Sequence, residues 1–222
     1  MRVSVEVFAD EAWAERTAER FIERSPQNAC LATGATMSPF LNRIAISDLS
    51  NTTVFLLDEF GGLAPDDPAR CKAMIRRDLV DKSKRPPTIQ VPSTDPPDPA
   101  GYQSLIDQHG LDLAVVGLGA NGHIGMNEPG SNADSSTRVV QLEPSTSDNA
   151  NTYGARTRPT WGVTVGMAPL LKADEIWLMV TGRHKRSILE RVLKAPIGPD
   201  IPATFLRNHS GFTVFADAKA AG

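Results

Sequence analysis

The chain has 222 residues, of which 41% are hydrophobic and 22% are charged, and a globular protein of this length buries a substantial core. The formal net charge is -3, which gives no reason to expect binding to nucleic acid or to an anionic membrane, since both favour a basic surface. Cys30 and Cys71 form no CxxC pair, and the histidines have no metal-binding spacing, so we expect neither disulfides nor a metal site. No apolar segment approaches the roughly 20 residues that span a bilayer. We therefore expect a cytoplasmic protein.

Short apolar runs alternate with amphipathic stretches along the chain. Val3–Phe8 predicts an edge strand, and Asp10 is the expected N-cap of a helix with an apolar stripe from Trp13 to Ile22. The proline-rich stretch Lys82–Ala100 predicts an irregular connector. Further strands are predicted at Ala29–Ala32, Thr53–Leu57, Leu111–Gly117, Ile176–Val180 and Phe212–Phe215, and helices after Gly34 and at Cys71–Leu79, Tyr102–His109 and Lys185–Leu193. This order predicts a single α/β domain, 1–222, with a parallel sheet and helices on both faces.

Four of the predicted strands run directly into polar turns that contain glycine. In an open parallel sheet, a ligand binds at the carboxyl ends of the strands. We therefore expect these turns to converge on one crevice. They are Thr33–Thr36, Asp58–Gly62, Gly117–Gly125 and Thr181–Arg183.

The third of these turns opens the segment Gly117–Ser131, GLGANGHIGMNEPGS, which contains a GxGxxG pattern. A dinucleotide-binding fingerprint requires a helix at its third glycine, whereas this segment soon reaches the helix-breaking Pro129. We therefore reject that interpretation. His123 with Glu128 five positions later is typical of an acid/base pair, although a histidine that only stabilises its own loop is equally compatible with the sequence.

Two further turns carry groups suited to a charged substrate. Asp58 and Glu59 follow a strand and should point to opposite faces, so one can reach the crevice while the other supports the scaffold or caps the next turn. Thr33–Thr36 precedes a helix, where backbone N–H groups attract phosphate, although many turns use these residues for geometry alone. Arg183–Arg186 opens another helix, and its basic side chains either meet an anion or form a solvated face.

Three motifs give the chain a family resemblance over nearly its whole length. They are LLDEFGGL (Leu56–Leu63), GLGANGHIGMNEPGS and TVGMAPLLKADEIWLMVTGRHK (Thr164–Lys185). The chain resembles the glucosamine-6-phosphate deaminases, which share a fold with the 6-phosphogluconolactonases. The resemblance implies a three-layer α/β/α sandwich with a mostly parallel, Rossmann-like sheet. It also implies conversion of glucosamine 6-phosphate to fructose 6-phosphate and ammonia, without a metal or redox cofactor.

The same resemblance implies a role for each matching residue. Asp58 would move a proton from C2 to C1 of the open-chain sugar, and His123 would transfer a proton between O1 and O5 to open the ring. Glu128 would orient His123, and Asn121 matches a further ring-opening position. The positions that match the phosphate site are Thr33, Gly34, Ala35, Thr36 and Lys185.

The chain also departs from the family pattern. Asn121 stands where some members have Asp, and Ala35-Thr36-Met37 replaces the usual Gly-Thr-Pro. The family's lid arginine has no clear counterpart: Thr152 or Tyr153 aligns nearest, with Arg156 and Arg158 close enough to substitute. We expect Arg138–Trp161 to form a mobile lid, because it is polar and lies between the site loop and the next strand.

Two other functions fit the same residues. One is hydrolysis of 6-phosphogluconolactone, although lactonases usually lack the Asn-Glu-Pro continuation seen at Asn127–Pro129. The other is a non-catalytic sugar-phosphate sensor, suggested by the altered phosphate turn. In each case the partner is a small sugar phosphate, and the chain is expected to be a monomer or a small homo-oligomer.

Overall fold

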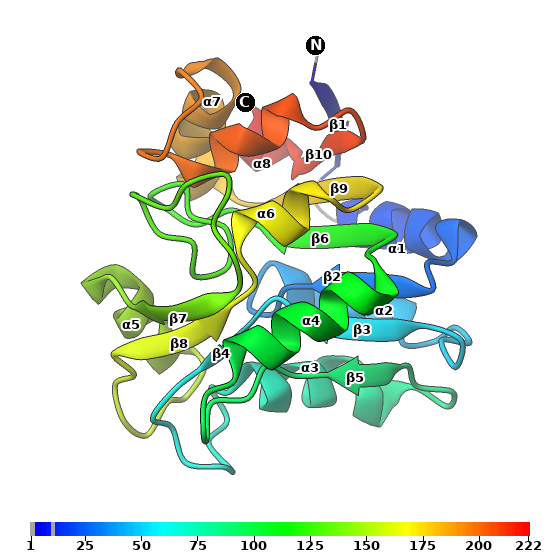
Figure 1. The fold of residues 1–222 in the computed structure, drawn as a ribbon. Coiled ribbons are helices and arrows are strands. Elements are labelled where there is room, and N and C mark those ends of the chain that lie inside the picture. The colour runs from blue at the N-terminus through cyan, green and yellow to red at the C-terminus, as the bar shows by residue number, and fades with distance from the viewer. Residues whose placement is uncertain (1–2, 10–11) are drawn as a thin grey trace.

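A computed structural model describes residues 3–9 and 12–222 of the chain. Within these residues, the main sheet has seven strands, and every hydrogen-bonded pair of neighbours is parallel (Figure 1). In spatial order they are β1 (Ser4–Phe8), β10 (Phe212–Asp217), β9 (Glu175–Val180), β6 (Leu113–Gly117), β2 (Asn28–Leu31), β3 (Thr53–Leu56) and β5 (Thr88–Gln90). The predicted parallel sheet is confirmed, and the predicted edge strand is β1. The proposed N-cap Asp10 lies outside the described residues.

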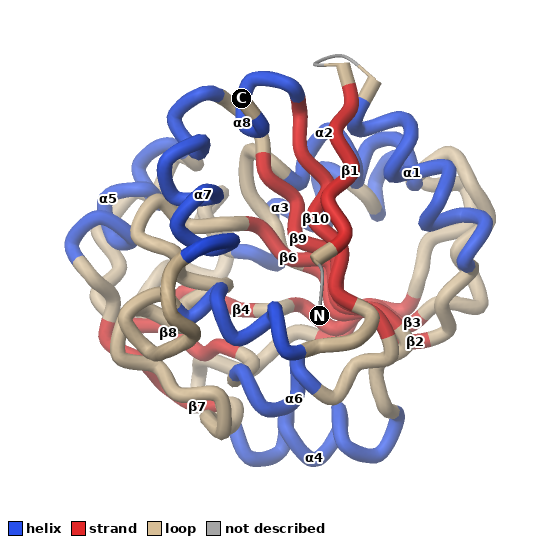
Figure 2. The backbone as a smooth tube through the Cα atoms, turned by 90° about the horizontal axis from the view of Figure 1, so that it is seen from above, coloured by secondary structure: helices blue, strands red, loops and turns tan. Residues whose placement is uncertain are grey.

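Helices cover both faces of this sheet and make the three-layer sandwich that we expected (Figure 2). One layer contains α1 (Trp13–Arg24), α2 (Met37–Ile44) and α3 (Cys71–Asp78), and the other contains α4 (Pro99–His109) and α6 (Met167–Leu171). Two helices pack together near β10, namely α7 (Arg186–Lys194) and α8 (Ala218–Ala221). Most residues of the central strands are apolar and buried, as expected for a sheet that is covered on both faces.

Local sequence signals explain the buried face of α1 and the start of α4. Residues Trp13, Ala18 and Phe21 form the buried stripe of α1, as their spacing predicts, whereas Ile22, the last residue of the predicted stripe, is 39% exposed. Helix α4 begins three residues before the predicted start, because Asp98 caps it by accepting a hydrogen bond from the Gly101 N–H and Pro99 fits its first turn. The other helical elements described are α5 (Pro144–Thr152) and the 3₁₀ segments η1 (Val80–Lys82), η2 (Arg183–Lys185) and η3 (Pro202–Asn208).

The connector Lys82–Ala100 is more ordered than we predicted. It contains β5, which pairs with β3 at the edge of the sheet. Prolines 87 and 92 flank this strand, and proline lacks the N–H that a longer ladder would need. The irregular interpretation was therefore wrong for these three residues, because a strand so short leaves no periodic signal.

A second, antiparallel sheet stands beside the main one and was not predicted. Its strands, in spatial order, are β4 (Asp58–Phe60), β8 (Trp161–Thr164) and β7 (Arg138–Gln141). Leu57 connects β3 directly to β4, with its N–H donating to Leu31 and its carbonyl accepting from Val165. The chain therefore passes from one sheet into the other immediately before Asp58.

The order of strands creates a switch point between β2 and β6. From β2 the chain adds β3 and β5 on one side, and from β6 it adds β9 and β10 on the other. The loops after two such strands diverge, which leaves a crevice at their carboxyl ends. Among the residues described, none of the helices combines the length and the apolar character needed to cross a bilayer.

Candidate active site

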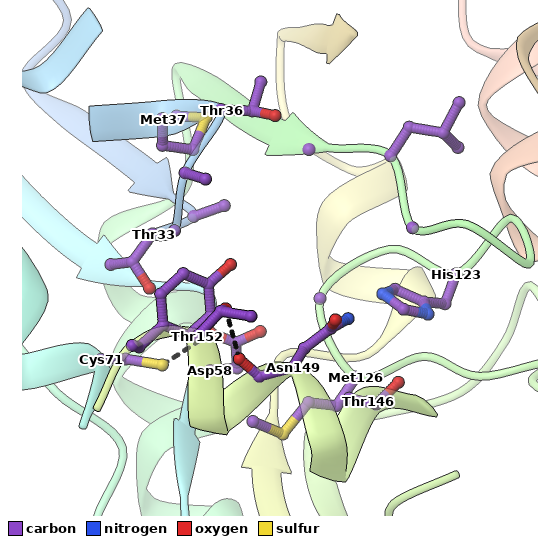
Figure 3. Close-up of a pocket in the computed structure, with 18 of the residues that line it drawn as sticks. Thr33, Thr36, Met37, Asp58, Cys71, His123, Met126, Thr146, Asn149 and Thr152 are labelled. Atoms are coloured by element: carbon purple, nitrogen blue, oxygen red, sulfur yellow. Dashed lines mark hydrogen bonds between the residues drawn. The ribbon is translucent and has the colours of Figure 1, made fainter. Parts of the chain in front are cut away.

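A pocket of about 400 Å³ lies at the carboxyl end of the main sheet. The turns that follow β2, β3 and β6 line it directly, and the fourth predicted turn contributes through the residues that follow it, His184 and Lys185. Asp58 and His123 line this same pocket, and Figure 3 shows His123 on the side opposite Cys71. The predicted convergence of strand ends is therefore present in the structure.

The side chains of Asp58 and Glu59 point to opposite sides of the strand, as predicted: Asp58 lines the pocket, and Glu59 is buried in the scaffold. Asp58 is partly exposed in the pocket, although protein surrounds it in most directions. Burial raises its pKa from 3.8 to about 6, with a smaller upward contribution from Glu59, while Cys71 and His123 act in the opposite direction. The Glu59 side chain is fully buried and accepts hydrogen bonds from the N–H groups of Phe60, Cys71 and Lys72. Glu59 thus fixes the start of α3.

His123 lies on the tight turn after β6, where Gly119 makes room for its ring. A β-carbon at Gly119 would lie 2.2 Å from that ring, so a larger residue there would displace the imidazole. The segment stays non-helical from Leu118 to Gly130, which agrees with our rejection of the dinucleotide fingerprint. Gly119 thus permits close packing against the histidine.

Glu128 and Asn121 contact His123 from behind the pocket wall. The Nδ1 atom of His123 lies 3.2 Å from Oε2 of Glu128, close enough for an ion pair but not aligned as a hydrogen bond. Asn121 donates to the same carboxylate oxygen at 3.0 Å and accepts from the backbone N–H of His123 at 3.1 Å. Thr146 donates to the other oxygen of Glu128.

These contacts decide the charge of Glu128. Burial acts to raise the pKa of Glu128, but its interactions with His123, Thr146 and Asn121 outweigh burial and leave the pKa below its ordinary value. The carboxylate is therefore ionised at neutral pH beside the imidazole. An ionised partner stabilises the protonated form of a histidine, as an acid/base group requires.

The turn Thr33–Thr36 forms another wall of the pocket. Gly34 has φ +100°, a conformation that favours glycine, and the hydroxyl of Tyr153 packs against it. Lys185 also lines the pocket, and burial lowers the pKa of its ammonium group. A cation and backbone amides on one wall suit an anionic group.

The two arginines expected to replace the lid arginine lie elsewhere. Arg156 pairs with Asp66 at 2.8 Å, Arg158 pairs with Asp148 at 2.7 Å, and neither lines the pocket. That expectation was wrong, because each arginine pairs with an exposed carboxylate outside the pocket, Arg158 with one 10 residues away and Arg156 with one 90 residues away. Within the described ranges, no group of three or more His, Cys, Asp or Glu side chains could hold a metal ion.

Comparison with known proteins agrees with this geometry. The family described as glucosamine-6-phosphate isomerases/6-phosphogluconolactonase matches residues 5–215. The chain belongs to this family.

Among curated relatives, the glucosamine-6-phosphate deaminase of Rhodopirellula baltica is 36% identical, with 99% of this chain and 95% of that protein covered. The deaminase of Lacticaseibacillus paracasei is 33% identical, with 99% and 98% covered. A solved monomeric glucosamine-6-phosphate deaminase is 28% identical with a TM-score of 0.87, covering 99% of both chains. The 6-phosphogluconolactonase of Thermotoga maritima has a TM-score of 0.79 at 19% identity, covering 97% and 99%, which shows the shared fold.

Several residues that line the pocket were not predicted from the sequence. Cys71 and Met74 come from α3, and Thr146 and Asn149 come from α5 (Pro144–Thr152). All of them lie in helices whose sequence shows no motif, and they reach the pocket only through packing. The segment 138–161, the expected lid, contains β7 and α5 and the first residue of β8; its mobility stays a prediction.

Proposed function

We propose that this protein converts glucosamine 6-phosphate to fructose 6-phosphate and ammonia. The observation that carries the proposal is one pocket lined by a carboxyl group, Asp58, and an imidazole, His123, together with a turn and a lysine suited to phosphate. The family of the chain and the names of its relatives, which are 32–36% identical, support the same reaction.

In this proposal Asp58 is the base that moves a proton between C2 and C1. With a pKa of about 6, its carboxyl group is about nine-tenths ionised at pH 7, so it is available as a base. Its raised pKa also makes it a stronger base than an ordinary aspartate, and its protonated form can return the proton to C1. A group near this pKa suits both halves of the transfer. We expect kcat/KM to fall as the pH drops through about 6.

His123 is the group that opens the sugar ring, by donating a proton to one oxygen and accepting one from another. Glu128 lies beside Nδ1 of His123 as its orienting partner, and Asn121 donates to Glu128 and holds it in place. Lys185 and the turn Thr33–Thr36 bind the phosphate. This remote contact supplies binding energy that positions the reacting carbons.

We also propose that the segment 138–161 opens to admit substrate. Support comes from the Tyr153 hydroxyl, which packs against Gly34 in the proposed phosphate turn. Tyr153 occupies space beside that turn, so we expect it to move when phosphate arrives. A monomeric state is supported by the monomeric relative. The cytoplasmic location rests on the sequence and on relatives that are metabolic enzymes.

The test is release of ammonia from glucosamine 6-phosphate, followed with a coupled assay. We expect turnover by the wild type and none by Asp58→Asn, which should still bind the substrate because the phosphate contacts remain. Turnover by Asp58→Asn at the wild-type rate would remove Asp58 from the mechanism.

The same preparation separates the alternatives. Hydrolysis of 6-phosphogluconolactone without ammonia release would favour the lactonase. Binding of glucosamine 6-phosphate with no turnover by the wild type would favour the sensor. The Asn-Glu-Pro continuation, which places Glu128 beside His123, supports the deaminase over the lactonase. The same acid/base pair supports it over the sensor, because a sensor has no need of one.

A further inference from the structure

Cys71 lies beside the carboxyl group of Asp58, at a position to which the resemblance assigns no role. Its thiol donates to Oδ1 of Asp58 with an S···O distance of 3.2 Å, drawn as a dashed line in Figure 3. Cys71 is the first residue of α3 and is only 2% exposed, yet it lines the pocket. The thiol therefore contacts the proposed base from inside the site.

The backbone of Cys71 is held rigidly by the residue next to Asp58. Glu59 accepts the Cys71 N–H at 2.9 Å and the Lys72 N–H at 3.0 Å. The carboxylates of two successive β4 residues thus hold Cys71: Glu59 accepts from its backbone N–H, and Asp58 accepts from its thiol. This double contact leaves the thiol little freedom to point elsewhere.

The thiol can act only as a donor to the carboxylate. Burial, followed by the charges of Asp58 and Glu59, raises the pKa of Cys71 well above its ordinary value, so the sulfur keeps its proton. The protonated sulfur therefore donates to Oδ1 of Asp58 and does not compete with it as a second anion.

This arrangement treats the two oxygens of Asp58 differently. Among the residues that the structure describes, the Cys71 thiol is the one side-chain donor to this carboxyl group, and it contacts Oδ1. The other oxygen, Oδ2, lies over Gly125, where a β-carbon would come within 3.1 Å of it. Oδ2 thus keeps its lone pairs for a ligand, and a side chain at position 125 would crowd it.

We propose that Cys71 is a positioning residue that anchors Oδ1 of Asp58 and so presents Oδ2 to the reacting carbons of the sugar. The inference rests on the proposed function for its catalytic consequence. Its structural part concerns the ligand-free protein. A donor to the ionised carboxylate stabilises that form, so removing the thiol should raise the pKa of Asp58.

Other groups around Asp58 bear on the same titration. Glu59 raises the pKa of Asp58 and His123 lowers it, and these contributions remain when Cys71 is replaced. The titratable groups that face Asp58 are Cys30 in β2, Glu59 in β4, Cys71 in α3, Tyr102 in α4, His123 after β6 and Tyr153 after α5.

The direct experiment titrates the Asp58 carboxyl carbon by NMR in ¹³C-aspartate-labelled, ligand-free protein, with the signal assigned from Asp58→Asn. We expect Cys71→Ala to move the midpoint to higher pH, and Cys71→Ser, whose hydroxyl is a stronger donor, to leave it unchanged or lower it. In Cys71→Ala a water molecule could take the place of the thiol and donate to Asp58. Cys71→Val fills that space without a donor, so its midpoint should move to higher pH even in that case. Cys30→Ala removes the other buried thiol and should leave the midpoint unchanged.

The kinetic experiment uses glucosamine 6-phosphate and the same variants. We expect Cys71→Val to lower kcat by roughly five- to tenfold with little change in KM, and to shift the acid limb of the kcat/KM profile to higher pH. Cys71→Ser should restore both kcat and the position of the acid limb. Equal NMR midpoints in wild type, Cys71→Ala and Cys71→Val would overturn the proposal. A wild type that titrates as expected but releases no ammonia would refute the proposed function and leave the anchoring of Asp58 established.

Discussion

Replacing Asp58 with asparagine should stabilise the folded protein at the same time as it abolishes turnover. The pKa of Asp58 is raised from 3.8 to about 6, chiefly by burial, so the folded state disfavours the charged form that the unfolded chain accepts freely. Each pKa unit corresponds to about 1.36 kcal/mol, so this displacement costs the folded state at most about 3 kcal/mol at neutral pH. Asparagine has nearly the same shape, and its carbonyl oxygen can still accept from Cys71.

The pH dependence of this effect follows from its sign. Above pH 6 the wild-type carboxyl group is charged in both states and the full cost applies. As the pH falls through about 6 toward 3.8, the folded protein takes up a proton first, and the cost disappears. The advantage of Asp58→Asn should therefore be largest at pH 7 and above, and should shrink steadily below pH 6.

Thermal unfolding measured at pH 7.5 and pH 5 provides the assay. For a chain of this size, about 3 kcal/mol corresponds to a rise in Tm of about 6–12 °C at the higher pH. Asp107→Asn changes an exposed carboxylate on α4 and should shift the Tm little at either pH, because an exposed ion pair contributes little stability. An Asp58→Asn variant that is less stable than the wild type at pH 7.5, or equally shifted at both pH values, would refute the burial argument.

Three further predictions concern the histidine turn, the phosphate site and the lid. Gly119→Ala should lower kcat by roughly ten- to a hundredfold, because its β-carbon meets the ring of His123, whereas Gly198→Ala, with open space around it, should leave kcat unchanged. Lys185→Ala should raise KM roughly tenfold or more with kcat nearly unchanged, and an unchanged KM would show that the phosphate binds elsewhere. Amide hydrogen exchange over 144–152 should be fast in the ligand-free protein and slow with sugar phosphate bound, and uniform protection without ligand would argue against a lid.

The sequence alone accounts for much of the scaffold. Apolar runs such as Leu111–Gly117 predict buried parallel strands because the signal is local and continuous. The alternation of Asp58 and Glu59 predicted one carboxylate in the crevice and one in the scaffold, because neighbouring side chains on a strand point to opposite sides. The motif that holds His123 and Glu128 is contiguous, so its internal contacts could be anticipated.

Only the tertiary structure brought in the residues that complete the pocket. Cys71 meets Asp58 because α3 begins where Glu59 holds it, and Tyr153, the residue that ends α5, packs against Gly34 in the turn after β2. Neither contact leaves a periodic or motif signal, since each joins segments that are adjacent only after folding. Arg156 likewise has its partner in Asp66, 90 residues away, which no local pattern reveals. The sequence determined which chemical groups stand at the strand ends, and long-range packing decided which neighbours tune them.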